Sequence, residues 1–330
     1  MNDIVLNVEN LCISFLYNKQ YYPVTRDVSF EVHKGEIFGL VGESGSGKSV
    51  TAKCILRLLP KRSSEVTKGR IIYDGKDILR LPFKEMYRIR GNNISMVFQE
   101  PMTSLNPVFK CGDQIIETIE LHQKVSRSNA YKMALDMLKL VSIPMPERRI
   151  NNYPHELSGG MRQRIMIAMA LACRPTILLA DEPTTALDPT IQAQIMELLK
   201  KLRDELQMAI LLISHDMAVI AENCDTVAVM YAGVVMEIAD VYELFENPIH
   251  PYTKGLLACI PDIKKEVGVL TGIPGYVPHM SEISKGCPFC TRCKFSTELC
   301  CEQLPSMRGT VRHKVRCHHF GLTAAKEVPE

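Results

Sequence analysis

The chain has 330 residues, of which 46% are hydrophobic and 23% charged, and its formal net charge is +2. This composition is ordinary for a globular protein, and so small a net charge excludes a strongly basic nucleic-acid or membrane-surface binder. No apolar run approaches the roughly 18 residues of a membrane helix, and the first ten residues lack the pattern of a signal peptide. We expect one large domain or two ordinary ones, which would serve a membrane only through partners.

The beginning of the chain predicts a small, mainly antiparallel β unit. Its strands are expected at residues 3–9, at Cys12–Phe15 and at Val28–Val32. Between the last two we expect an aromatic-rich loop from Tyr17 to Tyr22.

The stretch GESGSGKS, residues 42–49, has the form G-x-x-x-x-G-K-[ST] of a phosphate-binding loop. An apolar run at Glu36–Val41 predicts a buried strand before it, and helical spacing after it is seen at Val50, Cys54 and Leu58. Glycines let successive backbone N–H groups point into one concavity, and the following helix presents its positive end to the same anion. We expect Lys48 to reach the β- and γ-phosphates of a triphosphate and the Ser49 hydroxyl to bind Mg²⁺.

Aromatic side chains near such a loop can stack on a nucleotide base. Phe15 is our first candidate for this role and Tyr22 the second. The alternative, that these rings pack the β unit, has equal weight.

The middle of the chain predicts a helical insertion into an α/β framework. A hairpin is expected at Gly69–Tyr73 with its turn at Asp74-Gly75, and a buried strand at Asn93–Phe98 that ends on Gln99. Residues 112–141 have a helical pattern, and residues from about 102 to 173 form the insertion. Its apolar stripes contain Ile115, Ile119, Met133, Leu135, Leu138 and Val141.

Two further polar groups follow. Ser158-Gly159-Gly160 precedes a helix and so predicts a second anion site at a helix N-terminus. Asp181-Glu182 follows a wholly apolar strand at Ile177–Ala180, where the carboxyl end of a parallel strand faces a ligand crevice. We expect Asp181 to hold Mg²⁺ through water and Glu182 to orient an attacking water. The alternative is an acidic pair that merely starts a helix.

The rest of the α/β core is also predicted. A helix after Ala186-Leu187-Asp188-Pro189 has Ile191, Ile195, Leu198, Leu202 and Leu206 on one face. Strands are expected at Ala209–Ile213, Asp225–Tyr231 and Val234–Ile238, followed by a short helix at Asp240–Asn247. His215, just after the first of these strands, can contact a γ-phosphate, although a lone histidine is more often structural.

The order and spacing of these motifs resemble the ATP-binding subunit of an ABC transporter, over roughly residues 3–245. The resemblance rests on the phosphate loop, Gln99, the signature LSGGMRQ at 157–163, Ile177–Glu182, Ala186–Asp188 and His215. Further segments resemble the dipeptide/oligopeptide permease group, which includes nickel importers. They are VGESGSGKS, FQEPMTSLNP, LSGGMRQR, HPYTKGLL and the cysteine-rich segment Gly286–Cys293.

The resemblance implies an α/β fold with a P-loop NTPase core of mostly parallel sheet, an antiparallel β subdomain, a helical insertion and a small Cys-rich C-terminal extension. Its domains would be residues 1–101 (β subdomain and phosphate-loop part of the core), 102–173 (helical signature subdomain), 174–250 (rest of the core) and 251–330 (C-terminal extension). Within the extension, about residues 286–318 would be the metal-binding segment, after a linker at 262–286.

The resemblance also implies a head-to-tail dimer in which ATP lies between the phosphate loop of one subunit and Ser158 and Gly160 of the other. Glu182 would be the catalytic base, His215 a clamp on the γ-phosphate, and Gln99 a sensor of Mg²⁺ and the γ-phosphate, with Lys48 in the catalytic set. Met161 replaces a common Gln, as is usual in this group. The implied ATP contacts are Phe15, Gly42, Ser44, Gly45, Ser46, Gly47, Lys48, Ser49, Val50, Gln99, Ser158, Gly160, Asp181, Glu182, Asp188 and His215. The implied Mg²⁺ ligands are Ser49, Gln99 and Asp181.

The implied function is ATP hydrolysis that energises an importer of dipeptides or oligopeptides. The implied partners are a second ATP-binding subunit (a sister or itself), two transmembrane permease subunits and an extracytoplasmic substrate-binding protein, at the cytoplasmic face of the membrane. Alternatives are an importer of nickel or another small solute and, more remotely, a soluble ABC-type ATPase of nucleic-acid repair or translation. The chain has no second phosphate loop and no sustained heptads, and we expect no nucleic-acid partner.

The tail has six cysteines within 31 residues, Cys287 to Cys317. Permease-group tails have a pattern that Cys287, Cys293, Cys300 and Cys317 match, whereas Cys290 and Cys301 are extra, although Cys290 could substitute for a ligand. Four thiolates can bind a 4Fe–4S cluster or, alternatively, Zn²⁺. A further alternative is a solvated basic tail with reduced thiols.

Nearby cations could offset the negative charge of such a cluster, namely Arg292, Lys294, Arg312, Lys314 and Arg316. Because the tail is far in sequence from every ATP motif, we expect its cluster to be structural and without effect on the ATPase rate. The opposite possibility is a redox-sensing regulatory protein.

Overall fold

The structure is a computed structural model that describes residues 3–100, 104–185, 187–260, 272–283 and 285–319. It contains two compact units. The first comprises Met1–Val5, Val32–Glu36 and Arg80–Ile213, and the second comprises Leu6–Glu31, Ile37–Leu79 and Ser214–Glu330. These units do not coincide with the four predicted domains, whose boundaries stay a prediction. Among the described residues, no helix is both long and apolar enough to cross a membrane.

An antiparallel sheet lies mostly in the second unit. Its strand order is β2-β1-β4-β5, and the strands are β1 (Ile4–Tyr17), β2 (Gln20–His33), β4 (Ser64–Tyr73) and β5 (Lys76–Asp77). The predicted turn at Asp74-Gly75 is confirmed, because both residues have positive φ and Tyr73 pairs with Lys76.

The predicted aromatic loop from Tyr17 to Tyr22 is wrong. Tyr17 ends β1, and Tyr21 and Tyr22 already belong to β2. Only Asn18 and Lys19 lie between the strands, with φ of 48° and 65°. Two consecutive residues of positive φ form a tight turn whose twist matches that of paired strands, so no longer loop is needed.

The second unit also contains a mixed group of strands in the order β11-β12-β10-β9-β3. Here β3 (Ile37–Val41) is parallel to β9 (Thr226–Tyr231), which is antiparallel to β10 (Val234–Asp240). The tail adds β12 (His313–Val315), antiparallel to β10, and β11 (Arg308–Gly309). The helices of this unit are α1 (Lys48–Ile55), α9 (Met217–Asn223), α10 (Val241–Glu246), α11 (Pro251–Ala258) and α12 (Glu298–Glu302).

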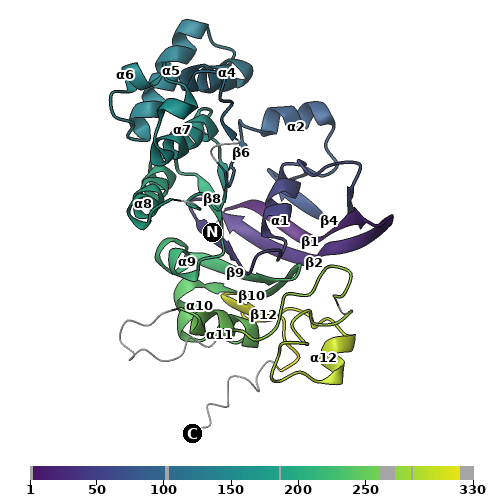
Figure 1. The fold of residues 1–330 in the computed structure, drawn as a ribbon. Helices are drawn as coiled ribbons and strands as arrows, with labels where there is room; N and C mark the ends of the chain where they lie inside the picture. The colour runs from purple at the N-terminus through teal and green to yellow at the C-terminus, as the bar shows by residue number, and fades with distance from the viewer. Residues whose placement is uncertain (1–2, 101–103, 186, 261–271, 284, 320–330) are drawn as a thin grey trace. The chain divides into compact units, whose positions relative to one another are not determined.

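The first unit combines three parallel strands with a helical group. The strands β6 (Ile94–Val97), β7 (Ile177–Asp181) and β8 (Ala209–Ser214) are buried throughout. The other helices are α2 (Phe83–Ile89), α4 (Cys111–Gln123), α5 (Arg127–Leu140), α6 (Pro146–Arg149), the 3₁₀ turn η1 (Pro154–Glu156), α7 (Gly159–Leu171) and α8 (Pro189–Leu206). Helices α4, α5 and α7 pack together (Figure 1).

The pattern over residues 112–141 corresponds to two helices. Lys124 ends α4 in the left-handed conformation, with φ of 51°, and Ser126 caps the N-terminus of α5 by accepting a hydrogen bond from the Asn129 N–H. A mostly parallel core with an antiparallel sheet and a helical insertion is therefore confirmed.

Candidate functional site

The predicted phosphate loop follows directly from the fully buried strand β3. Gly42 has φ of 155°, and a Cβ built there would lie 2.0 Å from the main-chain oxygen of Met230 in β9. Gly45 and Gly47 have φ of 77° and 96°. Glycine at 42 is thus required by close backbone approach, and glycines at 45 and 47 by conformations that L side chains rarely adopt.

Lys48 lies over this loop as the first residue of α1. Its ammonium group donates hydrogen bonds to the carbonyl oxygens of Gly42 (2.7 Å) and Glu43 (3.0 Å) and to the hydroxyl of Ser46 (3.2 Å). The first turn of α1 contains no acidic residue and its N-cap is Gly47, without a side-chain cap. A lysine charge and a helix N-terminus therefore converge on one loop, which is the arrangement that binds phosphate.

Contacts inside the second unit fix the position of the loop. The Gly233 N–H, in the turn between β9 and β10, donates to the Ser46 carbonyl (3.0 Å). The Glu43 N–H donates to the Tyr252 hydroxyl (3.0 Å), and the Glu43 carboxylate pairs with Arg292 (2.9 Å). Tyr252 and Arg292 lie in segments quoted above for the permease group, but their contacts with the loop could not be predicted, because each is more than 200 residues from it in the sequence.

A carboxylate site forms at the end of β7 in the first unit. Asp181 is buried, and Glu182 follows it with φ of 47°, an uncommon backbone conformation for a residue with a side chain. One Glu182 oxygen, Oε2, accepts hydrogen bonds from the Gln99 amide (2.9 Å) and the Thr185 hydroxyl (2.9 Å). The structure thus brings together two of the predicted site residues, Gln99 and Glu182, and adds Thr185, which the sequence did not indicate.

The signature helix α7 begins at an exposed turn. Ser158 caps this helix, since its hydroxyl accepts a hydrogen bond from the Met161 N–H (3.4 Å). Both Ser158 and Gly159 are exposed to solvent. A Cβ at Gly160 would lie 2.9 Å from the Ile191 side chain, so glycine there permits α8 to pack closely. Asp188 caps α8 by accepting from the Ile191 N–H (3.0 Å), which is a structural role for this predicted site residue. Ala186 lies outside the described residues.

The remaining predicted ATP contacts are divided between the units. His215 is exposed at the start of the second unit's C-terminal part, next to Asp216, which caps α9. Phe15 is half-buried near the end of β1 and Tyr22 is half-buried in β2. Because the phosphate loop belongs to the second unit and the carboxylate site to the first, each of these groups is assembled within its own unit.

The tail cysteines gather around one small cavity. It is lined by Cys287, Cys290, Cys293, Cys300 and Cys317, together with His250, His318 and His319. Burial raises the pKa of Cys287 to about 12, and it also raises the pKa values of Cys293 and Cys317. Cys301 is exposed, and the described residues contain no group of three or more histidine, cysteine or acidic side chains that could hold a metal ion.

Two of the tail cations form buried ion pairs. Arg292 and Arg316 are the partners of Glu43 and Asp27, both at 2.9 Å. The alternative of a solvated tail is therefore wrong at these two arginines, whereas their offsetting of a cluster's charge stays a prediction. Lys294, Arg312 and Lys314 are exposed. Residues 262–271 and 284 of the predicted linker at 262–286 lie outside the described residues.

Comparison with known proteins identifies the family. The ABC transporter family matches residues 25–185, and the family "Oligopeptide/dipeptide transporter, C-terminal region" matches residues 236–300. A "Probable peptide ABC transporter ATP-binding protein" of Sinorhizobium fredii is 50% identical over 304 residues, which cover 92% of this chain and 91% of the relative. The chain belongs to the ABC transporter ATP-binding family. It is accordingly an ATPase coupled to transport.

Other relatives of this ABC ATPase agree. The dipeptide transport ATP-binding protein DppD of Bacillus subtilis is 50% identical over 316 residues, covering 95% of this chain and 94% of DppD. The oligopeptide transport protein OppD of Bacillus subtilis is 49% identical, covering 92% of this chain and 85% of OppD. A dimeric ATP-binding cassette, MJ0796, bound to ADP and Pi superposes with a TM-score of 0.64 at 29% identity, covering 72% of this chain and 98% of the cassette.

Proposed function

We propose that this chain hydrolyses ATP to energise the import of dipeptides or oligopeptides. The observation that carries the proposal is the C-terminal match to peptide transporters at residues 236–300, which extends beyond the ATP-binding motifs. It is supported by relatives that are named for peptide transport and are about as long as this chain. Nickel or another small solute is the alternative substrate, and a role in nucleic-acid repair or translation is the more remote alternative.

Within each ATP site, the loop at 42–49 would bind the phosphates, with Lys48 leaving its carbonyl partners for the β- and γ-phosphates. Ser49, Gln99 and Asp181 would hold Mg²⁺, which when bound neutralises phosphate charge. Glu182 would accept a proton from the attacking water. The bonds from Gln99 and Thr185 to its Oε2 support this role, because they fix the direction of the carboxylate.

A second subunit would complete each site through Ser158 and Gly160. The exposed N-terminus of α7 supports this, since its N–H groups can face an anion on another molecule. The dimeric state of MJ0796 with ADP and Pi also supports it. We propose that the partners are a sister or identical ATPase subunit, two permease subunits and an extracytoplasmic substrate-binding protein, and that the chain lies peripherally at the cytoplasmic face of the membrane.

Nucleotide binding by the purified full-length chain tests the assignment of the loop. Lys48→Ala should weaken ATP binding by about 100-fold or more, because the main cation of the phosphate site is lost. Lys53→Ala, an exposed lysine on the same helix, is the matched control and should bind as the wild type does. Tight ATP binding by the Lys48 variant would refute the assignment.

Uptake by cells tests the substrate. Deletion of the gene for this chain should abolish accumulation of labelled dipeptides and oligopeptides while leaving nickel uptake unchanged. Wild-type protein should restore uptake, whereas Lys48→Ala should not. Loss of nickel uptake alone would favour the alternative, and identification of the membrane proteins that co-purify with the chain would show whether the proposed permease subunits exist.

We also propose that the tail binds a metal centre, as a 4Fe–4S cluster with Zn²⁺ as the alternative. The ligands would be Cys287, Cys293, Cys300 and Cys317, with Cys290 a possible substitute. Their gathering around one cavity supports the proposal. Because burial favours the neutral thiols, binding would require thiolates to form as the metal enters.

Metal analysis of anaerobically purified protein tests this second proposal. Iron near four atoms per chain with visible absorption would support the cluster, and one zinc per chain without absorption would support zinc. Cys287→Ser should lose the metal, whereas Cys301→Ser, at an exposed cysteine outside the cavity, should keep it. Absence of both metals from the wild-type protein would overturn the proposal.

A further inference from the structure

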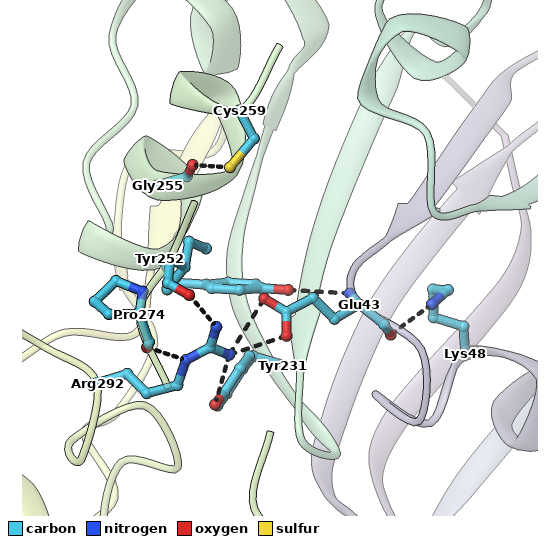
Figure 2. A network of polar contacts seen from close by, with 9 residues as sticks. Glu43, Lys48, Tyr231, Tyr252, Gly255, Cys259, Pro274 and Arg292 are labelled. Carbon is cyan, nitrogen blue, oxygen red and sulfur yellow. Dashed lines mark hydrogen bonds and ion pairs between the residues drawn. The ribbon is translucent and has the colours of Figure 1, made fainter. Parts of the chain in front are cut away.

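Glu43, the second residue of the phosphate loop, is held at three points (Figure 2). Its N–H donates to the Tyr252 hydroxyl (3.0 Å), and its carbonyl oxygen accepts from the Lys48 ammonium (3.0 Å). Its carboxylate accepts from Nη1 of Arg292, at 2.9 and 3.2 Å. A single loop residue therefore connects the phosphate-binding lysine with an arginine of the C-terminal segment, which lies 249 positions away.

The position of Arg292 is itself tightly determined. Its side chain is only 6% exposed. Besides Glu43, its guanidinium donates to the carbonyl oxygens of Ile273 and Pro274, both at 3.0 Å, and to the Tyr231 hydroxyl at 3.2 Å. Because a guanidinium is planar with donors in fixed directions, these acceptors fix its orientation as well as its place.

An aromatic cluster supports the same arginine. The guanidinium carbon lies 5.6 Å from the centre of the Tyr231 ring and 5.9 Å from that of Phe289. The ring of Phe289 also packs against the rings of Tyr231 and Tyr252, with distances between ring centres of 5.2 and 5.3 Å. Tyr252, which bonds to the phosphate loop, and Tyr231, which bonds to Arg292, are thus packed against a tail residue that lies between Cys287 and Cys290.

We propose that Arg292 is a positioning residue of the ATP site, which the C-terminal segment supplies to the phosphate loop. This inference rests on the proposed binding of ATP by that loop. Without Arg292, the Glu43 carboxylate would be an uncompensated negative charge on the loop that receives a polyanion, and the loop would lose the ion pair that holds its second residue. Arg292 acts through Glu43 and does not itself touch ATP.

From the separation along the chain, we expected the cluster of the tail to be structural and without effect on the ATPase rate. The contacts to Glu43 show that the tail reaches the phosphate loop directly. The tail would affect the affinity for ATP, because Arg292 compensates a charge on the loop that binds the phosphates. It would not affect the catalytic step, because the charge that Arg292 compensates is not that of the proposed catalytic base, Glu182.

Steady-state ATP hydrolysis by the full-length chain in its transporter tests the proposal. Arg292→Ala should raise KM for ATP about tenfold, equivalent to about 1.4 kcal/mol, with kcat changed by less than about twofold. Arg292→Lys, which keeps the charge, should recover part of this loss. Arg292→Met removes the charge but retains the packing against the aromatic rings. It should therefore show the same rise in KM, and it tests the proposal even if Arg292→Ala folds poorly.

A double substitution distinguishes this role from general support of the fold. Arg292→Met/Glu43→Gln should restore most of the affinity that Arg292→Met loses, because the loop then carries no uncompensated carboxylate. Arg316→Ala is the matched control, since Arg316 is an equally buried tail arginine that pairs with Asp27 and does not touch the loop.

The possible results separate clearly. Three results would each overturn the proposal. They are an unchanged KM in both Arg292→Ala and Arg292→Met, an equal rise of KM in Arg316→Ala, and no recovery of KM in the double variant. Failure of the underlying ATP assignment would show differently, as tight ATP binding by Lys48→Ala in the experiment described above.

Discussion

At the residue scale, Glu182 shows how much a motif can and cannot predict. An acidic pair after an apolar strand placed the carboxylate at the right end of β7. The positive φ of Glu182 and the hydrogen bond from Thr185 could not be predicted, because neither changes the pattern of residue types in the sequence. Both features direct the carboxylate, and a strained backbone at a site residue is consistent with selection for function.

The first prediction concerns this carboxylate. Glu182→Gln should abolish ATP hydrolysis while retaining ATP binding, because an amide cannot accept the proton of the attacking water. The variant should accumulate as an ATP-bound dimer, which sedimentation at saturating ATP and Mg²⁺ measures. Glu197→Gln, at an exposed position on α8, should hydrolyse ATP normally. Persistence of monomers of the Glu182 variant at saturating ATP would contradict the prediction.

The second prediction concerns pH. His250 is buried, and its Nδ1 accepts a hydrogen bond from the Tyr252 N–H (3.0 Å) at the start of α11. Burial lowers its pKa to about 4, although nearby Glu237 acts in the opposite direction. Since the folded pKa is lower than the unfolded value of 6.5, the folded protein resists protonation. Stability should be lost as pH falls from about 6.5 towards 4, by on the order of 3 kcal/mol.

Thermal unfolding of His250→Asn measures this contribution. Asparagine can also cap a helix N-terminus, yet it does not titrate. The melting temperature of the variant should therefore fall less steeply between pH 6.5 and pH 4.5 than that of the wild type. The other acidic groups titrate equally in both proteins and so do not contribute to the difference. Parallel curves for the two proteins would show that His250 does not carry the effect.

At the element scale, the sequence predicted strands and helices where local signals are strong. Alternation, apolar runs and the Asp74-Gly75 turn correctly placed β4, β7 and β8. The predictions were wrong where the deciding contacts are distant or where a short turn has no glycine, as at Asn18-Lys19. The tail strand β12 has only three residues, and it forms because it pairs with the edge of β10. No local sequence pattern predicts this pairing.

The third prediction concerns the attachment of β12 to β10. Glu237 in β10 is fully buried and accepts bonds from the Ile249 N–H (2.7 Å), the His250 N–H (3.0 Å) and His313 of β12 (2.7 Å). Glu237→Ala removes the acceptor of all three donors and should lower the free energy of unfolding by about 2–4 kcal/mol. Urea unfolding measures the loss. Glu246→Ala, at an exposed position nearby on α10, should change it by less than about 0.5 kcal/mol.

At the scale of the whole molecule, the sequence predicted the family and the core but not the contacts that the tail makes. The motifs of the predicted ATP site are local and dense, so the family could be recognised from the spacing of residues. The role of the tail depends on single long-range contacts, such as Arg316 with Asp27 and Arg292 with Glu43. Such pairs join residues more than 200 positions apart, and one sequence contains no information that pairs them.

The last prediction concerns the sharing of ATP between two molecules. The phosphate loop lies in the second unit and the signature helix α7, with its exposed N-terminus, in the first, and the signature of a second subunit would complete each ATP site. If so, hydrolysis requires two ATPase subunits, because ATP is the ligand that joins them. The rate per molecule of the purified chain should therefore rise with protein concentration and then reach a plateau.

The assembled transporter provides the control for this dilution series. Permease subunits that hold two ATPase subunits together should make the rate independent of dilution over the same range. A chain that requires a sister subunit should be inactive alone at every concentration and regain activity when that subunit is added, which equally supports a shared site. A constant rate for a species that sedimentation shows to be monomeric would mean that one molecule completes the pocket, and the proposed mechanism would then be wrong.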